Sequence, residues 1–488
     1  MEANDKIRIL LNKKEVVLVK PSDTTPCQVL SFSTMDNQFN PERMIQTLYV
    51  YRAANNSLDS TNFGSETERD DPALVLKEAL SKALVYYFPL AGKVKRRHDT
   101  DGRLQLTCTA DGVPFLEATA INCHLSSLNF FDGIDHFGSS KQLVFNWPSD
   151  SEYGSHPLCL QVTKFSCGGF TIGMGISHVL IDGFGAGMFF RTMTELASGK
   201  SEPTIKPVWK REILVGNGNH CYDHQDINDS IVKKPSFVTS QFLPTNEISL
   251  AIFDVDDESI RNLKKQMVQE LYSVADGDEE NINQQQIFTT IEALGAYIWR
   301  SRYRALRQNR DGRTILRLAT GIRNFIKPPL PQGYYGNAFL TANVELLGRD
   351  LDGGPLSKVA KLIKETKKAN SKNEQIWKSL HQMEKLRQEK NNVSAEDNIF
   401  DGVSLILSDW RRLRLLEEDD FGWKSCVNLV PIPWRPTYGF NELCVFTNPP
   451  RRNDTKMKGG VRIYLSLPAA AMQRFNQEMD ALKSKDLS

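Results

Sequence analysis

The stretch that decides the fold reads Phe170-Thr-Ile-Gly-Met-Gly-Ile-Ser-His178-Val-Leu-Ile-Asp182-Gly-Phe-Gly-Ala-Gly187. Its first eight residues alternate large apolar side chains with small ones. This pattern predicts a half-buried strand whose second face allows a close approach to the backbone. His178 follows the strand directly, and a glycine-rich turn leads into a helical pattern that stops at Gly199. A strand that delivers a single histidine to such a turn can place a general base in a crevice.

The pair His178 and Asp182 also has ordinary structural interpretations. A pattern of two fixed residues arises easily by chance in a chain with 8 His. An aspartate just before a helical pattern is a good cap for the amides of the first turn. A histidine at a strand end is often only a satisfied polar residue. The pattern therefore suggests catalysis but needs support from elsewhere in the chain.

Length and composition indicate a soluble globular enzyme with more than one domain. The chain has 488 residues, of which 40% are apolar and 24% charged. A net charge of +1 gives no sign of a surface for nucleic acid or acidic membranes. No signal peptide or membrane span is evident, and the 8 Cys have no paired spacing. We therefore expect a cytoplasmic protein that binds neither nucleic acid nor membranes.

Strand and helix patterns are mixed along the chain and predict an α/β architecture. In the first half, short strand patterns follow one amphipathic helix at 72–87, and one of these strands is expected at 143–147. In the second half, a single long polar helix is expected at 358–391. No internal repeat is visible.

A region between the two halves has a different composition. Residues 199–246 are rich in Pro, Asn, Asp and Gly and show little periodicity, which indicates a linker. His220 and His224 have a spacing that binds metal when it is helical, but glycines argue against a helix and no third ligand lies nearby. We expect no metal site.

Six motifs along the chain carry a family resemblance. They are Tyr87-Phe-Pro-Leu-Ala-Gly92, Cys167-Gly-Gly169, His178-x-x-x-Asp182-Gly183, Pro329-Leu-Pro-Gln-Gly-Tyr-Tyr-Gly-Asn337, Ser408-x-Trp410 and Asp420-Phe-Gly-Trp423. Their order and spacing resemble those of the plant BAHD acyltransferases, which transfer acyl groups from coenzyme A thioesters to alcohols or amines. The resemblance runs from about Val16 to Met479, nearly the whole chain.

Two positions depart from the family pattern. Lys424 stands where the family usually has a second glycine after its Asp-Phe-Gly-Trp motif, and this departure puts the local turn in doubt more than the chemistry. Gly321 stands two residues before Arg323, where the family commonly has an aspartate.

The resemblance implies a fold of two similar-sized α/β domains with mixed sheets, of the chloramphenicol-acetyltransferase type. On this basis we divide the chain into an N-terminal domain at 1–215, a crossover linker at 216–245 and a C-terminal domain at 246–488. The active site would lie in the channel between the domains, with His178 at its middle. The resemblance further implies acyl-CoA as co-substrate, no bound cofactor, a small-molecule alcohol as acceptor, and a monomer.

The resemblance also implies roles for individual residues. His178 would take the proton from the attacking hydroxyl and return it to the leaving thiolate. The indole N–H of Trp410 or the hydroxyl of Ser408 would stabilise the oxyanion of the tetrahedral intermediate. Without the family, we would interpret Trp410 as a buried core aromatic. Asp182 would turn away from the reacting centre and pair with Arg323, which holds the His178 loop in place.

The Asp420-Phe421-Gly422-Trp423 motif is expected on a turn remote from His178, where it would act through packing.

In contrast to a serine hydrolase, the chain has no Gly-x-Ser-x-Gly elbow. A ternary complex is therefore the expected mechanism.

Three functions stay open at this level. The first is an O-acyltransferase of plant specialised metabolism, and the second is an N-acyltransferase for polyamines or aromatic amines. The second would require clustered acidic residues in the acceptor channel. The third is a non-catalytic small-molecule-binding member, which a lost His178 would favour. The segments 167–170, 205–213 and 409–413 resemble terpenoid-acylating members, including taxane acetyltransferases, but the sequence selects neither donor nor acceptor.

Overall fold

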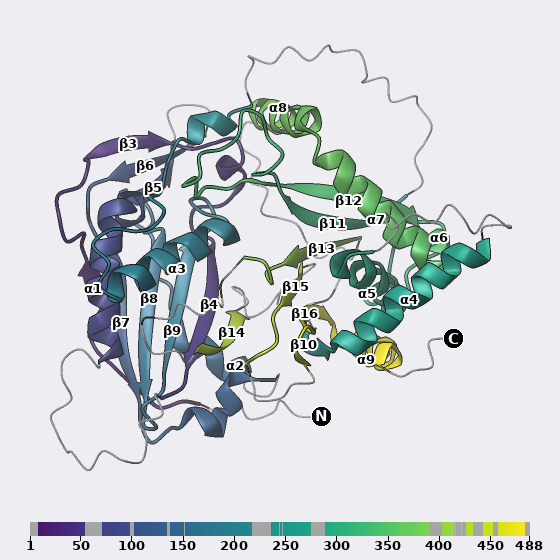
Figure 1. Ribbon diagram of the computed structural model, residues 1–488, viewed down its shortest axis with the longest axis horizontal. Coiled ribbons are helices and arrows are strands. Elements are labelled where there is room, and N and C mark those ends of the chain that lie inside the picture. The colour runs from purple at the N-terminus through teal and green to yellow at the C-terminus, as the bar shows by residue number, and fades with distance from the viewer. Residues whose placement is uncertain are drawn as a thin grey trace.

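Two large mixed sheets organise the protein, each with its own helices (Figure 1). The computed structural model describes residues 8–53, 71–97, 102–133, 137–150, 152–216, 236–243, 245, 247–274, 288–389, 403–413, 415, 421, 426–432, 443–451 and 457–483. Each sheet contains parallel and antiparallel pairs, as the resemblance implies. No helix among these residues is long and apolar enough to cross a membrane.

The sheet of the N-terminal half has seven strands. In order of pairing they are β1 (Leu11–Lys13), β7 (Val113–Ala120), β8 (Leu158–Phe165), β9 (Phe170–Ser177), β4 (Met44–Tyr51) and β14 (Cys426–Ile432), and β2 (Val17–Val19) also pairs with β7. Only β7 and β8 run parallel among these pairs. Helices α1 (Pro72–Tyr86) and α3 (Gly183–Ala197) pack on one face and close the first core.

Strand β9 lies in the middle of this sheet, and all eight of its residues are buried, so the prediction of a half-buried strand is wrong. The small residues on its second face make room for the chain's own segment 141–147. A Cβ atom at Gly173 would lie 2.0 Å from the carbonyl oxygen of Leu143.

The segment 141–147 contains a short 3₁₀ helix, η5 (Lys141–Leu143), and then irregular backbone, so the predicted strand at 143–147 is also wrong. It crosses the face of the sheet instead of extending its edge. Side chains of the sheet, and not a neighbouring strand, donate hydrogen bonds to carbonyl oxygens of segment 141–147. Gln161 Nε2 donates to the Gln142 oxygen at 3.1 Å, and Cys159 Sγ donates to the Phe145 oxygen at 3.1 Å.

The sheet of the C-terminal half has six strands. In order of pairing they are β10 (Ile248–Val255), β16 (Val461–Pro468), β15 (Leu443–Thr447), β13 (Ser404–Asp409), β11 (Arg313–Gly321) and β12 (Phe339–Leu347). Strand β13 runs parallel to both of its neighbours. Its helices are α4 (Asp257–Val274), α5 (Thr290–Ala305), α6 (Gly348–Gly353), α7 (Leu356–Asn370) and α9 (Ala469–Lys483). They enclose the second core.

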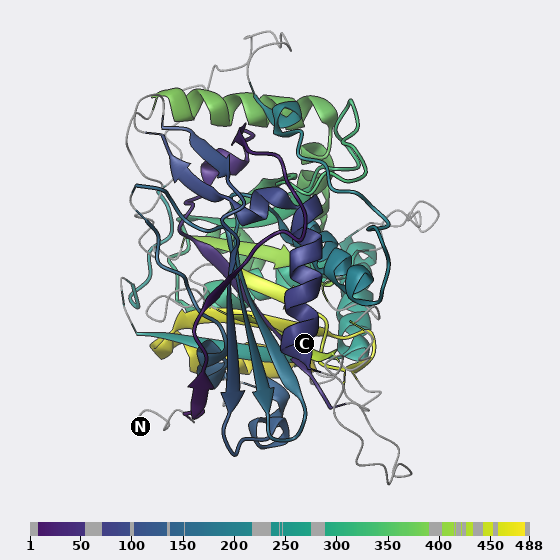
Figure 2. The same ribbon diagram turned by 90° about the vertical axis from the view of Figure 1, so that its left-hand side faces the viewer.

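The long helix predicted at 358–391 is two helices, α7 and α8 (Asn373–Glu389). Helix α7 ends at Asn370, and the hydroxyl of the next residue, Ser371, donates to the Lys367 carbonyl oxygen. Because the helix is interrupted here, the two helices can pack against different cores. Helix α7 packs on the C-terminal sheet, whereas α8 lies across the top of the molecule beside the small sheet β3 (Gln28–Ser31), β6 (Leu104–Cys108) and β5 (Lys93–Arg96) (Figure 2).

Strand β14 and helix α8 both connect the halves. Strand β14 comes from the C-terminal half but pairs with β4 of the N-terminal sheet, and a third core forms there between the two sheets. Helix α8 contributes to a fourth core with Met35 and Leu214. The division at 216–245 stays a prediction, since 217–235 lie outside the described residues. The N-terminal sheet nevertheless takes one strand from the range 246–488.

Candidate active site

His178 follows the last residue of β9 and lies where the two halves meet. The ring of Phe39, from the N-terminal half, stacks on the imidazole with centroids 4.3 Å apart and planes 6° apart. The ring of Phe339, at the start of β12, lies 5.6 Å from it at a tilt of 47°. Both faces of the junction therefore contribute aromatic surface to the imidazole.

The side-chain amide of Asn337 fixes the proton on this imidazole. Its Nδ2 donates to Asp36 Oδ1 at 2.7 Å and to the His178 carbonyl oxygen at 2.7 Å, which uses both amide hydrogens. The amide oxygen is then the atom that meets His178 Nδ1, at 3.0 Å. Because that oxygen can only accept, Nδ1 carries the proton and Nε2 is left with its lone pair. This is the tautomer that a general base requires.

Burial lowers the pKa of His178 below its ordinary value of 6.5. The hydrogen bond at its own backbone, the carboxylate of Asp182 and the bond to Asn337 raise the pKa, and Arg43 lowers it further, but burial prevails. The imidazole is therefore neutral at pH 7 and able to accept a proton.

Asp182 faces away from the imidazole and pairs with Arg323, the contact that the sequence analysis predicts. The guanidinium donates to both carboxylate oxygens, at 2.7 and 2.9 Å. Asp182 also accepts from the amides of Gly185, as the N-cap of α3, and of Ala338. It thereby joins the His178 loop to the segment that carries Asn337.

The glycines at the start of α3 leave room for residues of the C-terminal half to pack against the helix. A Cβ atom at Gly185 would lie 2.0 Å from the carbonyl oxygen of Tyr335, and one at Gly183 would lie 2.4 Å from Leu413 Cδ1. The glycine-lined turn predicted after His178 is therefore a contact surface between the two halves.

Ser408 and Trp410 lie at the end of β13 and just beyond it. The indole N–H of Trp410 donates to Ser408 Oγ at 3.1 Å, and the ring packs against the first and third cores. The indole proton is thus engaged, whereas the Ser408 hydroxyl proton can still be donated. Within the described chain no hydrogen bond joins either residue to His178, and their part in stabilising an oxyanion stays a prediction.

Phe421 is the one described member of the Asp-Phe-Gly-Trp motif. It is buried in the first core, where its ring meets Phe190 of α3 edge-on at 5.5 Å. A packing role fits this position. Asp420, Gly422, Trp423 and Lys424 lie outside the described residues.

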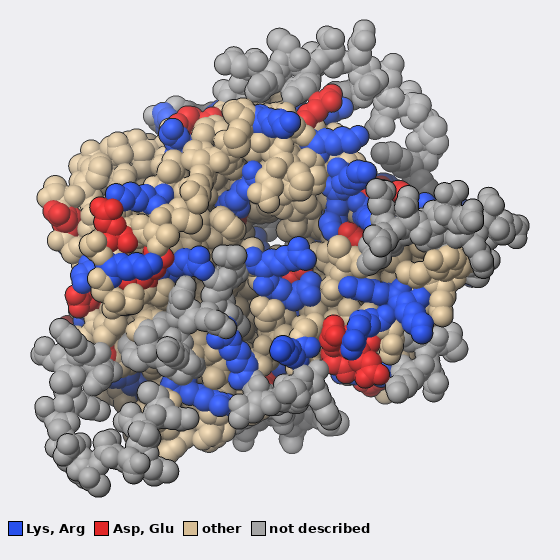
Figure 3. Space-filling model, viewed as in Figure 1, with Lys and Arg blue, Asp and Glu red and all other residues tan. Residues whose placement is uncertain are grey.

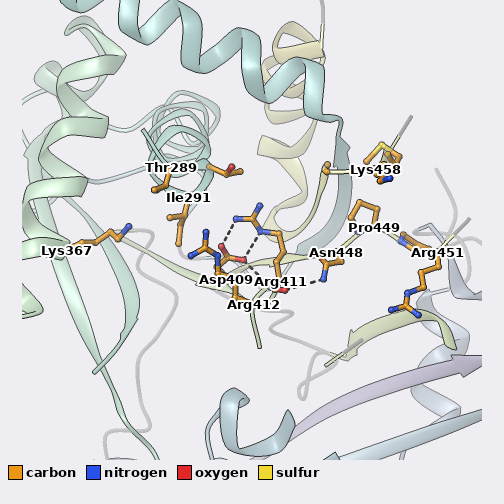
Figure 4. Close-up of a pocket in the computed structure, with 15 residues that line it drawn as sticks. Thr289, Ile291, Lys367, Asp409, Arg411, Arg412, Asn448, Pro449, Arg451 and Lys458 are labelled. Atoms are coloured by element: carbon orange, nitrogen blue, oxygen red, sulfur yellow. Dashed lines mark hydrogen bonds and ion pairs between the residues drawn. The ribbon is translucent and has the colours of Figure 1, made fainter. Parts of the chain in front are cut away.

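A pocket of about 590 Å³ opens in the C-terminal half (Figure 4), and Asp409 and Arg411, on either side of Trp410 in the chain, both line it. Its basic side chains are Lys367, Arg411, Arg412, Arg451 and Lys458. Among the described lining residues Asp409 is the one acid, and Arg411 binds that carboxylate with two hydrogen bonds, at 2.8 and 2.6 Å. Thr289 and Thr290, at the start of α5, also line the pocket. Lys and Arg side chains gather near the middle of the molecular face that Figure 3 shows.

Four of the described residues around His178 carry no role in the sequence analysis: Asn337, Phe339, Asp36 and Phe39. Asn337 ends one of the six motifs, and Asp36 and Phe39 lie on or beside η1 (Asp36–Gln38), a 3₁₀ helix more than a hundred residues before His178. No pattern in the chain links them, because only the fold brings them together. A search among the described residues for three or more His, Cys, Asp or Glu side chains that could hold a metal ion finds no such group. His220 and His224 lie outside the described range.

Comparisons with known proteins identify the family of this chain. A sequence model described as the Transferase family matches residues 9–482. The chain is 38% identical to a spermidine coumaroyl-CoA acyltransferase of Arabidopsis thaliana, over 97% of this chain and 96% of that protein. It is 30% identical to a taxadien-5-alpha-ol O-acetyltransferase of Taxus chinensis, over 99% of each. The crystal structure of vinorine synthase has the same fold, with a TM-score of 0.67, 20% identity and coverage of 97% of this chain and 98% of that one.

Fold and sequence together define an acyl-CoA-dependent acyltransferase. The chain belongs to the Transferase family, the BAHD acyltransferases, whose co-substrate is an acyl-CoA. The chain is more similar to the spermidine acyltransferase, at 38% identity, than to the taxadien-5-alpha-ol O-acetyltransferase, at 30% identity.

Proposed function

We propose that this protein transfers an acyl group from coenzyme A to an amine nitrogen of an aliphatic polyamine, with His178 as general base. The observation that carries the acceptor class is the 38% identity, over nearly the whole chain, to a spermidine acyltransferase. An alcohol acceptor is the second candidate, because a Taxus O-acetyltransferase is 30% identical.

The proposed reaction proceeds in two steps. The neutral amine attacks the thioester carbonyl carbon, and a C–N bond forms while the carbonyl oxygen becomes an oxyanion. His178 Nε2 takes a proton from the amine nitrogen as this bond forms. The C–S bond then breaks, the oxyanion returns to a carbonyl, and the imidazolium gives its proton to the coenzyme A thiolate. The hydroxyl of Ser408, oriented by Trp410, is the proposed donor to the oxyanion.

The surroundings of His178 suit a neutral amine better than a cation. Burial disfavours an ammonium at the reacting position, as it disfavours the imidazolium. The two acids near the site, Asp36 and Asp182, are each paired with an arginine. Asp36 and Asp182 therefore do not supply the cluster of acidic residues that is expected in the acceptor channel of a polyamine acyltransferase. The rings of Phe39 and Phe339 offer a cation–π surface for a second ammonium of the acceptor.

We place the phosphates of the donor in the basic pocket of the C-terminal half. The five basic side chains of the described lining, two of which also pair with carboxylates (Arg411 with Asp409 and Lys367 with Glu292), would attract the diphosphate and 3′-phosphate of coenzyme A. The N-terminus of the 16-residue helix α5 adds amide groups and the positive end of the helix dipole. Trp410 directly precedes two of the pocket residues, so the thioester arm would lead from this pocket toward Ser408.

The donor site is tested by Arg412→Ala and Lys458→Ala, both at exposed positions. Each change should raise KM for acyl-CoA about tenfold and leave kcat and the acceptor KM unchanged. Lys82→Ala, at a half-exposed position of α1 outside the pocket, is the control and should change neither constant. The wild-type preference for coenzyme A thioesters over their 3′-dephospho forms should shrink in one of the two variants. Unchanged donor KM values in both would place the phosphates elsewhere.

The acceptor class is tested by incubating the protein with several acyl-CoAs and, separately, spermidine and a panel of plant alcohols. Product masses identify the acylated acceptor, and mild alkali distinguishes esters, which are cleaved, from amides, which persist. We expect alkali-stable spermidine products. Alkali-labile products from alcohols alone would replace the amine proposal with the alcohol one.

We also propose that the protein acts as a cytoplasmic monomer. The described cysteines are free thiols, as in a reducing compartment, and both contributions to the His178 site come from one chain. Light scattering after gel filtration tests whether the protein is a monomer. The location of a fluorescent fusion protein in the cell tests whether it is cytoplasmic.

A further inference from the structure

Arg211 is almost fully buried, at 1% side-chain exposure, although no step of the proposed reaction uses it. It lies on η6 (Arg211–Leu214), just before the crossover between the halves. Its guanidinium carbon lies 4.3 Å from the ring centre of Trp209, 4.9 Å from that of Tyr335 and 5.2 Å from that of Tyr334. A buried cation in an aromatic cage needs an anion nearby.

That anion is Asp36. Arg211 Nε lies 3.5 Å from Asp36 Oδ2, and the Asp36 side chain is 0% exposed. The same carboxylate accepts from the Ser33 amide at 3.0 Å and, through Oδ1, from Asn337. The positive charge of Arg211 offsets the cost of burying the negative carboxylate of Asp36 and holds that carboxylate beside Asn337.

The Asp36 carboxylate in turn helps to decide which way the amide of Asn337 faces. With a carboxylate and the His178 carbonyl on one side, only the NH₂ end of the amide can face them, because both neighbours are acceptors. If Asp36 lost this position, the NH₂ end would keep only backbone acceptors, and the preference over the reversed amide orientation would weaken. The reversed amide would present N–H to His178 Nδ1 and move the imidazole proton to Nε2.

We propose that Arg211 is a positioning residue that acts through Asp36 and Asn337 to hold His178 in the Nδ1-protonated tautomer. The motif Gly333-Tyr-Tyr-Gly-Asn337 is built for this arrangement. Tyr334 and Tyr335 form two walls of the Arg211 cage. A Cβ atom at Gly336 would lie 1.0 Å from Arg211 Nη1, so only glycine leaves room for the guanidinium. This inference rests on the proposed role of His178.

The test reads the tautomer directly by ¹⁵N NMR of the full-length protein labelled at histidine. The signals of His178 are those missing from His178→Gln. In the wild type we expect a protonated Nδ1 and an unprotonated Nε2. Arg211→Met should move the population toward the Nε2-protonated form, and Asp36→Asn, which keeps the size of the side chain, should do the same. Arg211→Lys, which retains the charge, should preserve the wild-type tautomer.

Kinetics give a second measurement. Arg211→Met should lower kcat by about 10²-fold or more with little change in either KM. A histidine base in the wrong tautomer lowers kcat by up to about 10⁴-fold in a serine protease. Arg211→Lys should recover most of the loss. Arg302→Met is the matched control, because Arg302 is equally buried, at 1% exposure, but lies in the second half's helix α5. It should lower the melting temperature without moving the tautomer.

A wild-type tautomer in both Arg211→Met and Asp36→Asn would overturn the inference, even if activity fell. So would an equal tautomer shift in Arg302→Met, since general loosening would then explain it. If the tautomer shifts as expected but His178→Ala remains active, the positioning inference holds and the general-base proposal fails. The two failures are therefore distinguishable.

Discussion

His178 shows how one side chain can be adjusted by neighbours of different kinds. Phe39 holds the plane of its ring, Asn337 selects the nitrogen that carries the proton, and burial lowers its pKa. Each effect alone is modest. Together they give a neutral, oriented imidazole with a free Nε2, which is what proton transfer from an acceptor requires.

His178→Ala should reduce kcat by about 10²–10⁴-fold, the usual contribution of a general base. The fold should be preserved, because the ring lies at a junction whose other aromatic groups, Phe39 and Phe339, remain in place. Initial rates and thermal melting of the same preparation check both statements. A variant that keeps more than about a tenth of the wild-type kcat would rule out the general-base role.

The lowered pKa of His178 also predicts a pH dependence of stability. Below about pH 6.5 the unfolded chain binds a proton that the folded protein resists, so the folded state loses stability as the pH falls. Above that pH both states are neutral and the effect vanishes. The free energy of unfolding of the wild type relative to His178→Gln should therefore fall between pH 7 and 5. A difference that stays constant with pH would contradict the direction of the pKa shift.

Asp182 and Arg323 form a pair whose side chains are 7% and 17% exposed. Asp182→Ala should lower the free energy of unfolding by about 3–5 kcal/mol, because it leaves a largely buried guanidinium without its partner. Activity should fall with it, and Arg323→Ala should behave similarly. The double variant should lose less than the sum of the two, as urea unfolding of all four proteins would measure. Additive losses would mean that the pair is not coupled.

At the scale of elements, α3 joins the reacting centre to the first core. Its N-terminus is capped by Asp182 and contacts the C-terminal half, while Phe189 and Phe190 further along it are buried against the sheet. Phe421 packs on Phe190, so the Asp-Phe-Gly-Trp motif contacts α3 well beyond its first turn. The motif can thus support the site without touching the substrate.

Phe421→Ala should therefore lower stability without changing the chemistry of the folded protein. Removal of a buried phenylalanine ring costs about 3–5 kcal/mol. We expect a lower melting temperature, with kcat per folded molecule and donor KM unchanged at a temperature where the variant is folded. Phe421→Leu, which keeps most of the volume, should lose less stability. A loss of kcat with an unchanged melting temperature would show that the motif acts on the reaction.

For the whole molecule, the two halves depend on each other. Strand β14 extends the N-terminal sheet, and α8 reaches the N-terminal half through the buried carboxylate of Glu384, which binds Arg103 and the Thr34 hydroxyl. Arg462 of β16 contacts Asp132 at 2.6 Å across the same junction. His178 and Asn337 meet only because these connections hold the halves in register.

A fragment of residues 1–215 should accordingly fail to fold as a stable monomer. Without β14, strand β4 becomes an unprotected edge, and Leu48 and Val50 lose the side chains of the C-terminal half that cover them. Gel filtration should find aggregated or unfolded material, and denaturant unfolding should lack a cooperative transition. A monomeric fragment with a cooperative transition would show that the N-terminal half folds independently.

The sequence by itself determined the elements whose patterns are local. The alternation at 170–177 predicted β9, the apolar stripe at 72–87 predicted α1, and ordered motifs that include His178 and Asp182 placed the chain in one family of enzymes. Such features are readable because a strand, a cap or a motif is written in neighbouring residues.

Only the tertiary structure decided what the small face of β9 contacts, how β14 joins the other half, and which residues surround the imidazole. Asp36, Arg211 and Asn337 are separated by more than a hundred residues at each step, and their roles depend on burial and on the direction of hydrogen bonds. Those properties arise only when distant segments pack together and exclude water, so no local pattern records them.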